Sequence, residues 1–182
     1  MQEVQITQSP WVWSIVGKRG KFFGVLFGEV IAVDPRDALS RALTSAAGKD
    51  SLVAEVCNVP VEVLDEAPCN GDTSLDIELE HLTIKLRKCS LSSFDPPAPW
   101  QPAYSKWRHG GWYTTVRYLN GACGCVSRNY PDRKWRIVCD QRRRHDELGQ
   151  PGDFTYPSID AAARAEYALA KMEEAGLYQS VY

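Results

Sequence analysis

The second half of the chain is organised around one stretch, Gly111–Asp140, with the sequence GWYTTVRYLNGACGCVSRNYPDRKWRIVCD. Asn120-Gly121 is a strong two-residue signal for a β-hairpin, and segments rich in aromatic and β-branched residues flank it. Pro131-Asp132-Arg133 indicates a second turn. The stretch therefore predicts three antiparallel strands, at Gly111–Leu119, Ala122–Tyr130 and Lys134–Asp140.

A two-residue turn would fix the register of this hairpin, because it pairs Leu119 with Ala122 and every other pair follows. Trp135 and Ile137 then lie on the face of the sheet that has to be buried. The opposite face is expected to be open to solvent. Its basic and aromatic side chains in this register are Tyr113, Arg117, Arg128, Tyr130, Lys134 and Arg136.

A helix is predicted after the three strands. Pro157-Ser158 starts it, Gly176 ends it, and small alanines between them allow close packing on a sheet. The helix entry, Tyr156-Pro157-Ser158-Ile159-Asp160-Ala161-Ala162-Ala163-Arg164-Ala165, resembles the aromatic–x–Thr–x–acid–acid–Ala–Ala–Arg–Ala run in the DNA-binding domain of plant ethylene-response factors. Three strands followed by one helix are also similar to the arm-binding domains of phage integrases.

This resemblance covers the second half of the chain and implies a mode of binding. In those families the sheet lies in the major groove of DNA and the helix packs behind it. Carried over to this sequence, the resemblance implies that the contact residues are Arg117, Arg128, Lys134 and Arg136.

The net charge of the chain hides a basic block. The 21 Lys and Arg residues and 23 Asp and Glu residues give a formal charge of −2. Residues 104–145, however, carry a net charge of +8, whereas residues 1–103 and 146–182 each carry −5. Arg142, Arg143 and Arg144 extend the block beyond the third strand. Arginines beside aromatic rings suit phosphates and bases, so nucleic-acid binding is predicted; the alternative is a solvated face paired with the acidic segments.

The first half predicts a separate acidic unit of the order ββαβ. Strands are expected at Trp11–Val16, Lys21–Val33 and Leu52–Leu64, and Asp34-Pro35 starts a helix that ends at Gly48. Gly24 and Gly28 are expected to mark bulges or close approaches. Leucines of residues 73–89 have helical spacing, but other apolar residues there alternate as in a hairpin; we favour the helix.

Four prolines between residues 90 and 105 indicate a semi-rigid linker. We therefore expect an α+β protein of two small domains, an acidic ββαβ domain at residues 1–89 and a βββα domain with a basic sheet face at residues 106–182. The N-terminus has no secretory signal, and no apolar stretch is long enough for a membrane helix, so we expect a cytoplasmic protein without membrane contact.

Neither a metal site nor an active site is predicted. Cys123, Cys125, Cys139 and His145 are a candidate zinc set, but Cys-x-Cys lacks the usual zinc-knuckle spacing, and the predicted register puts these cysteines in the core. The sequence shows no nucleophile signature and no phosphate-binding glycine loop. We expect a non-enzymatic protein without a cofactor.

Two functions fit these features. The first is nucleic-acid binding through the basic and aromatic sheet face. The second is an inhibitor or adaptor, of the kind that mobile elements encode against host complexes such as CRISPR effectors, which binds a host protein or ribonucleoprotein. Small size, two compact units, acidic flanks and the tryptophans Trp100 and Trp107 near the linker favour the second.

Overall fold

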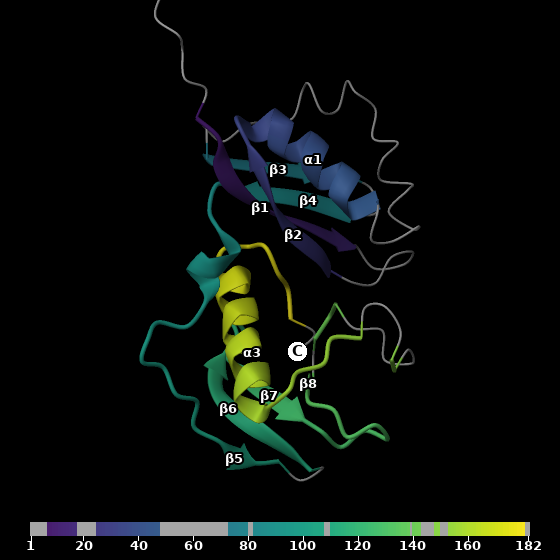
Figure 1. Cartoon of the computed structure of the whole chain (residues 1–182), viewed down its shortest axis with the longest axis vertical. Helices are drawn as coiled ribbons and strands as arrows, with labels where there is room; N and C mark the ends of the chain where they lie inside the picture. Colours follow the sequence, from purple (N-terminus) through teal and green to yellow (C-terminus); the bar gives the residue numbers. More distant parts are fainter. Residues whose placement is uncertain are drawn as a thin grey trace, which may run out of the picture. The chain divides into compact units, whose positions relative to one another are not determined.

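The computed structural model describes residues 7–17, 25–47, 73–79, 82–107, 110–138, 140–142, 148–149 and 153–180. The chain divides into two compact units, Met1–Ser93 and Phe94–Tyr182, and Figure 1 shows the elements of each. Each unit has a four-stranded antiparallel sheet and one α-helix among its described residues, which confirms the α+β class. None of the described helices has the length and hydropathy to cross a membrane.

Unit 1 is a sheet covered on one face by a helix (Figure 1). The strands have the order β2-β1-β4-β3. The elements are β1 (Ser9–Gly17), β2 (Val25–Ala32), α1 (Pro35–Ala47), β3 (Ser74–Glu78) and β4 (Leu82–Arg87). Asp34 caps α1 as expected, because its Oδ1 accepts hydrogen bonds from the amides of Arg36 and Asp37 at 2.9 and 2.8 Å. The predicted strand Leu52–Leu64, Gly24 and Gly48 lie outside the described residues.

The helix favoured for residues 73–89 is wrong. This segment is the β3–β4 hairpin, and its alternating apolar side chains Leu75, Ile77, Ile84 and Leu86 enter the same core as α1. A period of two puts all of these side chains on one face of a sheet, which a helix could not do. The leucine spacing that suggested a helix includes Leu79, which follows β3 and is only partly buried.

Gly28 is a close-approach point, as its position in the sequence predicts. It lies opposite Trp13 in the β1–β2 ladder, and Trp13 is fully buried. A Cβ atom on Gly28 would lie 2.8 Å from the indole Cζ2 of Trp13. Only a residue without a side chain leaves room for the ring here.

Unit 2 holds the second sheet, of order β5-β6-β7-β8, with helix α3 packed on β6, β7 and β8 (Figure 1). A 3-10 turn, η3 (Leu91–Phe94), precedes it at the unit boundary. The elements are β5 (Ser105–Lys106), β6 (Gly111–Arg117), β7 (Cys123–Ser127), β8 (Arg136–Ile137) and α3 (Ile159–Glu174). Ser158 caps α3, since its side chain accepts a hydrogen bond from the amide of Ala161 at 3.1 Å. Strand β5 was not predicted and begins inside the expected linker.

The predicted register of the β6–β7 hairpin is wrong by one residue at the turn. The amide of Tyr118 donates to the carbonyl of Ala122 at 3.0 Å, so three residues form the loop instead of two. Gly121, the last of them, has a φ of 83°, a left-handed conformation typical of such three-residue loops. Beyond a bulge between Tyr113 and Arg117, the pairing shifts further.

This slip reverses the two faces of β7. Residues directly opposite each other in a ladder share a face, so Cys123 lies with Arg117 and Cys125 with Tyr113. Val126, which was predicted to face solvent, is instead fully buried. On β6 the alternation is as predicted. We call the face of the sheet away from α3, where Tyr113, Thr115 and Arg117 are exposed, the open face.

Substitution of Gly28 by alanine tests the close packing in unit 1. We expect Gly28→Ala to lower the free energy of unfolding by about 1–3 kcal/mol, because the new methyl group forces the Trp13 ring or the β1–β2 ladder to shift. Urea denaturation followed by tryptophan fluorescence measures the change. An unchanged midpoint would show that the ring moves without cost.

Candidate nucleic-acid interface

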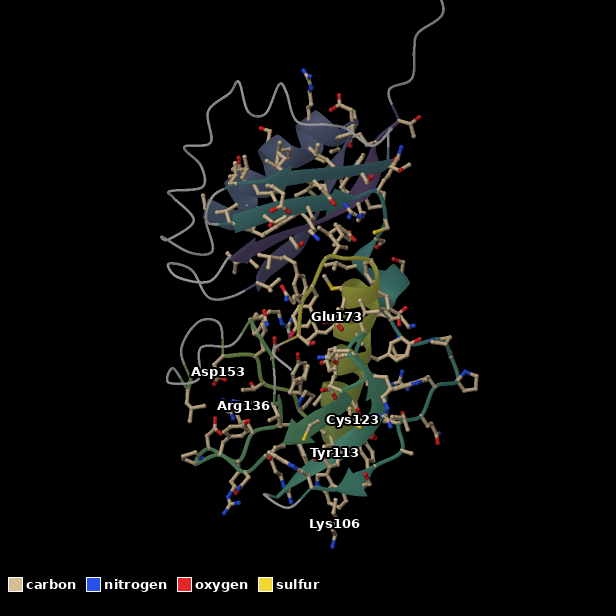
Figure 2. The ribbon with its side chains drawn as sticks, turned by 180° about the vertical axis from the view of Figure 1, so that it is seen from behind. Lys106, Tyr113, Cys123, Arg136, Asp153 and Glu173 are labelled. Atoms are coloured by element: carbon tan, nitrogen blue, oxygen red, sulfur yellow. The ribbon has the colours of Figure 1, made fainter. Side chains whose placement is uncertain are left out.

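The open face of unit 2 carries an aromatic pair beside a cation. Tyr113 is 37% exposed, and its ring packs against that of Trp107 with 6.2 Å between the ring centres. Arg117 is exposed on the same strand. Lys106 of neighbouring β5 is also exposed, but it pairs with Trp112 and so lies on the other face of the sheet; Figure 2 labels Tyr113 and Lys106. Arg117 also has a structural role, because its Nη1 donates to the carbonyls of Thr114 and Val116 at 3.3 and 3.0 Å.

Arg136 does not lie on an open surface, which contradicts the prediction. Its side chain has no exposed area. Its guanidinium donates to both carboxylate oxygens of Asp153, at 2.7 and 2.6 Å, and to both of Asp132, at 2.8 and 2.7 Å (Figure 2 labels Arg136 and Asp153). The guanidinium carbon also lies 4.7 Å from the ring centre of Tyr130. Arg136 and Tyr130 are therefore engaged inside the unit.

These ion pairs favour the charged forms of Arg136 and Asp132. Hydrogen bonds to Asp153 and Asp132 raise the pKa of the Arg136 guanidinium, and the bond from Arg136 lowers the pKa of Asp132 far below its usual range. A guanidinium between two carboxylates carries no positive charge that a phosphate could use. With one guanidinium and two carboxylates, the cluster of Arg136, Asp132 and Asp153 carries a formal net charge of −1.

Arg142 is engaged in the same way. Its Nε donates to Oδ1 of buried Asp140 at 2.8 Å, its Nη2 donates to the hydroxyl of Tyr156 at 3.0 Å, and it lies over the ring of Phe154. The predicted contact residues Arg143 and Arg144 lie outside the described residues. Arg142, which is the described member of the triple-arginine run, therefore stabilises unit 2 through these contacts.

Exposed cations remain around these internal pairs. Arg128 is exposed, with its guanidinium carbon 5.3 Å from the ring centre of Trp135. The remaining exposed basic residues of the described basic block are Lys106, Arg117, Arg133 and Lys134. The predicted set is therefore divided: Tyr113, Arg117, Arg128 and Lys134 are exposed to different degrees, whereas Arg136 and Arg142 are tied to aspartates.

A buried carboxylate that was not predicted from the sequence lies beneath this sheet. Glu166 of α3 is fully buried and accepts hydrogen bonds from the amide of Cys125 at 2.7 Å, from Oγ1 of Thr114 at 3.1 Å and from the hydroxyl of Tyr118 at 3.4 Å. Burial raises the pKa of Glu166 to about 7. Gly124 makes room for it, because a Cβ atom there would lie 2.5 Å from Oε2 of Glu166.

A second buried glutamate, two helical turns further along α3, also accepts backbone hydrogen bonds. Glu173 accepts the amide of Leu119 at 2.8 Å and the amide of Ser180 at 2.7 Å, so it joins the hairpin end and the residues after α3. Glu166 and Glu173 are seven residues apart and lie on the same helix face as Ala162, Leu169 and Ala170. That spacing was the available signal: both glutamates fall on the apolar stripe of the predicted helix.

The candidate zinc set is only partly described. Cys123 is half-buried and Cys125 is buried, both as free thiols, whereas Cys139 and His145 lie outside the described residues. Within the described ranges, no three His, Cys, Asp or Glu side chains gather as a metal site would require. The zinc set therefore stays a candidate from sequence alone.

Comparison of the chain with protein-family models, curated proteins and solved structures gave no match. The resemblance of the α3 entry to ethylene-response factors thus stays a prediction.

The buried Glu166 predicts an unusual dependence of stability on pH. Its pKa in the folded state, about 7, lies above the ordinary value of 4.5, so its contribution is full below about pH 4.5 and is lost as the pH rises through 7. Because glutamine does not titrate, we expect the free energy of unfolding of Glu166→Gln to vary less with pH over this range than that of the parent protein. The difference is on the order of 1–3 kcal/mol. Thermal unfolding from pH 5 to 8 measures it.

The matched control is Glu174→Gln on the exposed side of the same helix, which should leave the pH profile as in the parent protein. A Glu166→Gln protein whose profile runs parallel to that of the parent would contradict the assignment.

Proposed function

We propose that the protein is a non-enzymatic binding protein that binds nucleic acid through the exposed basic and aromatic side chains of unit 2. One observation carries the proposal: Arg117 and Tyr113 are both exposed on the open face of β6, and the half-buried Trp107 ring packs against Tyr113. Arginine forks and aromatic rings side by side suit a phosphate backbone and its bases. The proposal keeps residues 106–182 as the binding domain, with a βββα core.

The internal ion pairs reduce the set of residues in the proposed interface. Arg136 and Arg142 are assigned to the scaffold, since moving either to a phosphate would leave a buried aspartate without its partner. The proposed contacts are Lys106, Arg117, Arg128 and Lys134, with Tyr113 as the aromatic contact; Arg143 and Arg144 stay in the proposal from sequence.

Four phosphate contacts predict a moderate salt dependence. The slope of log K against log salt concentration is about −0.9 per contact on duplex DNA, so the four described cations predict about −3.6. Contacts from Arg143 and Arg144 as well would make the slope about −5.4.

Charge reversal at two lysines tests the proposal. The Lys106 and Lys134 side chains are both exposed, so Lys106→Glu/Lys134→Glu should fold normally. We expect at least a tenfold loss of affinity, roughly 1.4 kcal/mol, and a shallower salt slope. Fluorescence anisotropy with labelled duplex DNA, single-stranded DNA and RNA measures both.

The control Arg36→Glu/Lys88→Glu makes the same change in net charge on exposed positions of unit 1. It should bind as the parent protein does. Equal losses in the two double variants would mean that net charge alone determines binding, and a parent protein without salt-dependent binding would refute the proposal.

An inhibitor or adaptor that binds a host protein or ribonucleoprotein complex is the second candidate function. The short β5 favours it: among the described residues, no strand pairs with the rest of that edge of β6, and such an edge suits a peptide. A stoichiometric protein partner that survives nuclease treatment, together with no nucleic-acid binding by the pure protein, would favour this candidate over the first.

A further inference from the structure

Strand β5 leaves the sheet after covering only part of β6. It pairs Ser105 with Tyr113 and Lys106 with Trp112. The residues before it turn onto α3 instead: the Trp100 ring packs 5.1 Å from that of Tyr167, and Nη2 of Arg164 donates to the Trp100 carbonyl at 2.7 Å. Among the described residues, no strand therefore pairs with the outer edge of β6 at Thr115–Arg117.

The backbone of β6 directs hydrogen-bonding groups to this edge. The carbonyl of Gly111 accepts from the amide of Trp107 at 2.9 Å, on the β5 side, while the amide of Tyr118 donates toward Ala122, on the β7 side. Residues two apart in a strand direct their backbone groups to the same side. The alternation of exposed and buried side chains in β6 continues through Thr115 and Arg117 despite the bulge between Tyr113 and Arg117, so we infer that the amides and carbonyls of Thr115 and Arg117 point to the edge that β5 leaves open.

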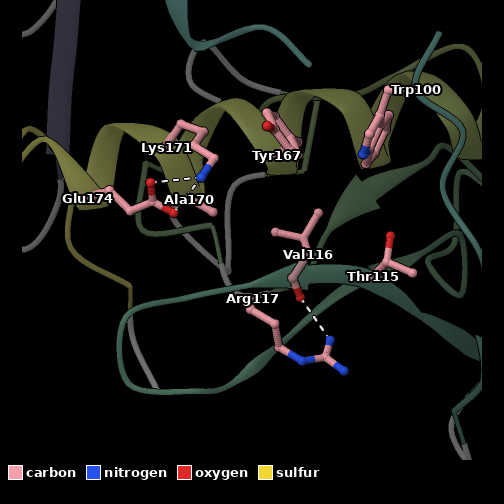
Figure 3. Close-up of a pocket in the computed structure, with 8 residues that line it drawn as sticks. All are labelled: Trp100, Thr115, Val116, Arg117, Tyr167, Ala170, Lys171 and Glu174. Atoms are coloured by element: carbon pink, nitrogen blue, oxygen red, sulfur yellow. Dashed lines mark hydrogen bonds and ion pairs between the residues drawn. The ribbon is translucent and has the colours of Figure 1, made fainter. Parts of the chain in front are cut away.

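A pocket of about 220 Å³ lies beside this edge, between β6 and α3 (Figure 3). Val116 and Ala170 form apolar walls, Tyr167 and Trp100 form aromatic ones, and the Lys171–Glu174 ion pair of 2.6 Å lies at its other end. Its eight lining residues are Trp100, Thr115, Val116, Arg117, Tyr167, Ala170, Lys171 and Glu174. The dimensions and lining suit one apolar side chain.

The charge around the pocket is positive. Of its lining residues, Arg117 and Lys171 are cationic and Glu174 is acidic, and Arg164 adds a cation over the Trp100 ring. Lys171 lies over the Tyr167 ring in the same way. These cations occupy a face of each ring, which leaves the rings as walls for a side chain and disfavours stacking of a nucleobase on those faces.

We propose that this groove binds an extended acidic peptide of a partner protein, which adds as a strand to Thr115–Arg117 of β6. The free backbone groups select an extended chain, the pocket takes one apolar side chain of the peptide, and the surrounding cations favour acidic neighbours. This inference shares Arg117 with the proposed nucleic-acid interface but does not use Lys106 or Lys134, so variants of those two lysines separate the two proposals.

The test removes one backbone donor at the edge. The probe is a fluorescein-labelled peptide, Glu-Val-Glu-Leu-Glu-Val-Glu, with the lysine analogue Lys-Val-Lys-Leu-Lys-Val-Lys for comparison. Thr115→Pro lacks the amide that the added strand needs, whereas Thr115→Val keeps it and keeps the β-branched shape. We expect the acidic peptide to bind, the lysine analogue to bind at least about tenfold more weakly, and Thr115→Pro to lose about tenfold in affinity while Thr115→Val stays within about twofold.

Three results would overturn the inference. Absence of binding of the acidic peptide at millimolar concentration is the first, and equal binding by folded Thr115→Pro and Thr115→Val is the second. The third is occupation by a second copy of the chain: a dimer in sedimentation equilibrium that Thr115→Pro abolishes.

Two further measurements keep the test decisive. Amide hydrogen exchange should show protection of Thr115 and Arg117 in the parent protein when the peptide binds, which a folding defect in the proline variant cannot imitate. The Lys106→Glu/Lys134→Glu variant should bind the peptide as the parent does, so failure of the nucleic-acid proposal and failure of this one give different results.

Discussion

Unit 2 depends on one hydrogen bond across its layers, from the amide of Cys125 in β7 to the buried carboxylate of Glu166 in α3. A buried carboxylate is costly unless donors surround it, and here an amide and two hydroxyls do so. The bond requires that α3 approach the sheet closely, which Gly124 permits because it has no side chain. Glu173 of α3 makes a similar bond at the end of the hairpin, where its carboxylate accepts the amide of Leu119.

The same unit uses aspartates to engage its arginines. Asp132 and Asp153 enclose Arg136, and Asp140 binds Arg142, so two arginines of a block with a net charge of +8 are compensated within the unit. The Arg142–Asp140 pair is neutral, and the Arg136 cluster has a formal charge of −1. Asp153 comes from the acidic C-terminal segment, so the neutralisation that the sequence left open occurs in part within the unit. Exposed cations, and not the total, determine what the surface can bind.

How far the sequence predicts the fold depends on the range of the interaction that decides each element. The cap at Asp34, the cap at Ser158 and the strand content of Gly111–Ile137 follow from local signals and agree with the structure. The β3–β4 hairpin was the less favoured of two alternatives, because Leu79 completes a helical spacing by coincidence. Of the candidate site, the exposure of Arg117 and Tyr113 was predicted correctly, but that of Arg136 was not.

The sequence by itself determined the α+β class, the two helices and the alternation of β6, because caps and periodicity act over a few residues. Only the tertiary structure decided on which face of the sheet each β7 side chain lies, and which arginines are exposed or paired with aspartates. A single additional loop residue at Gly121 reversed β7, since the side-chain period of a strand is two. Arg136 is buried because Asp153, seventeen residues away, reaches it only in the folded unit.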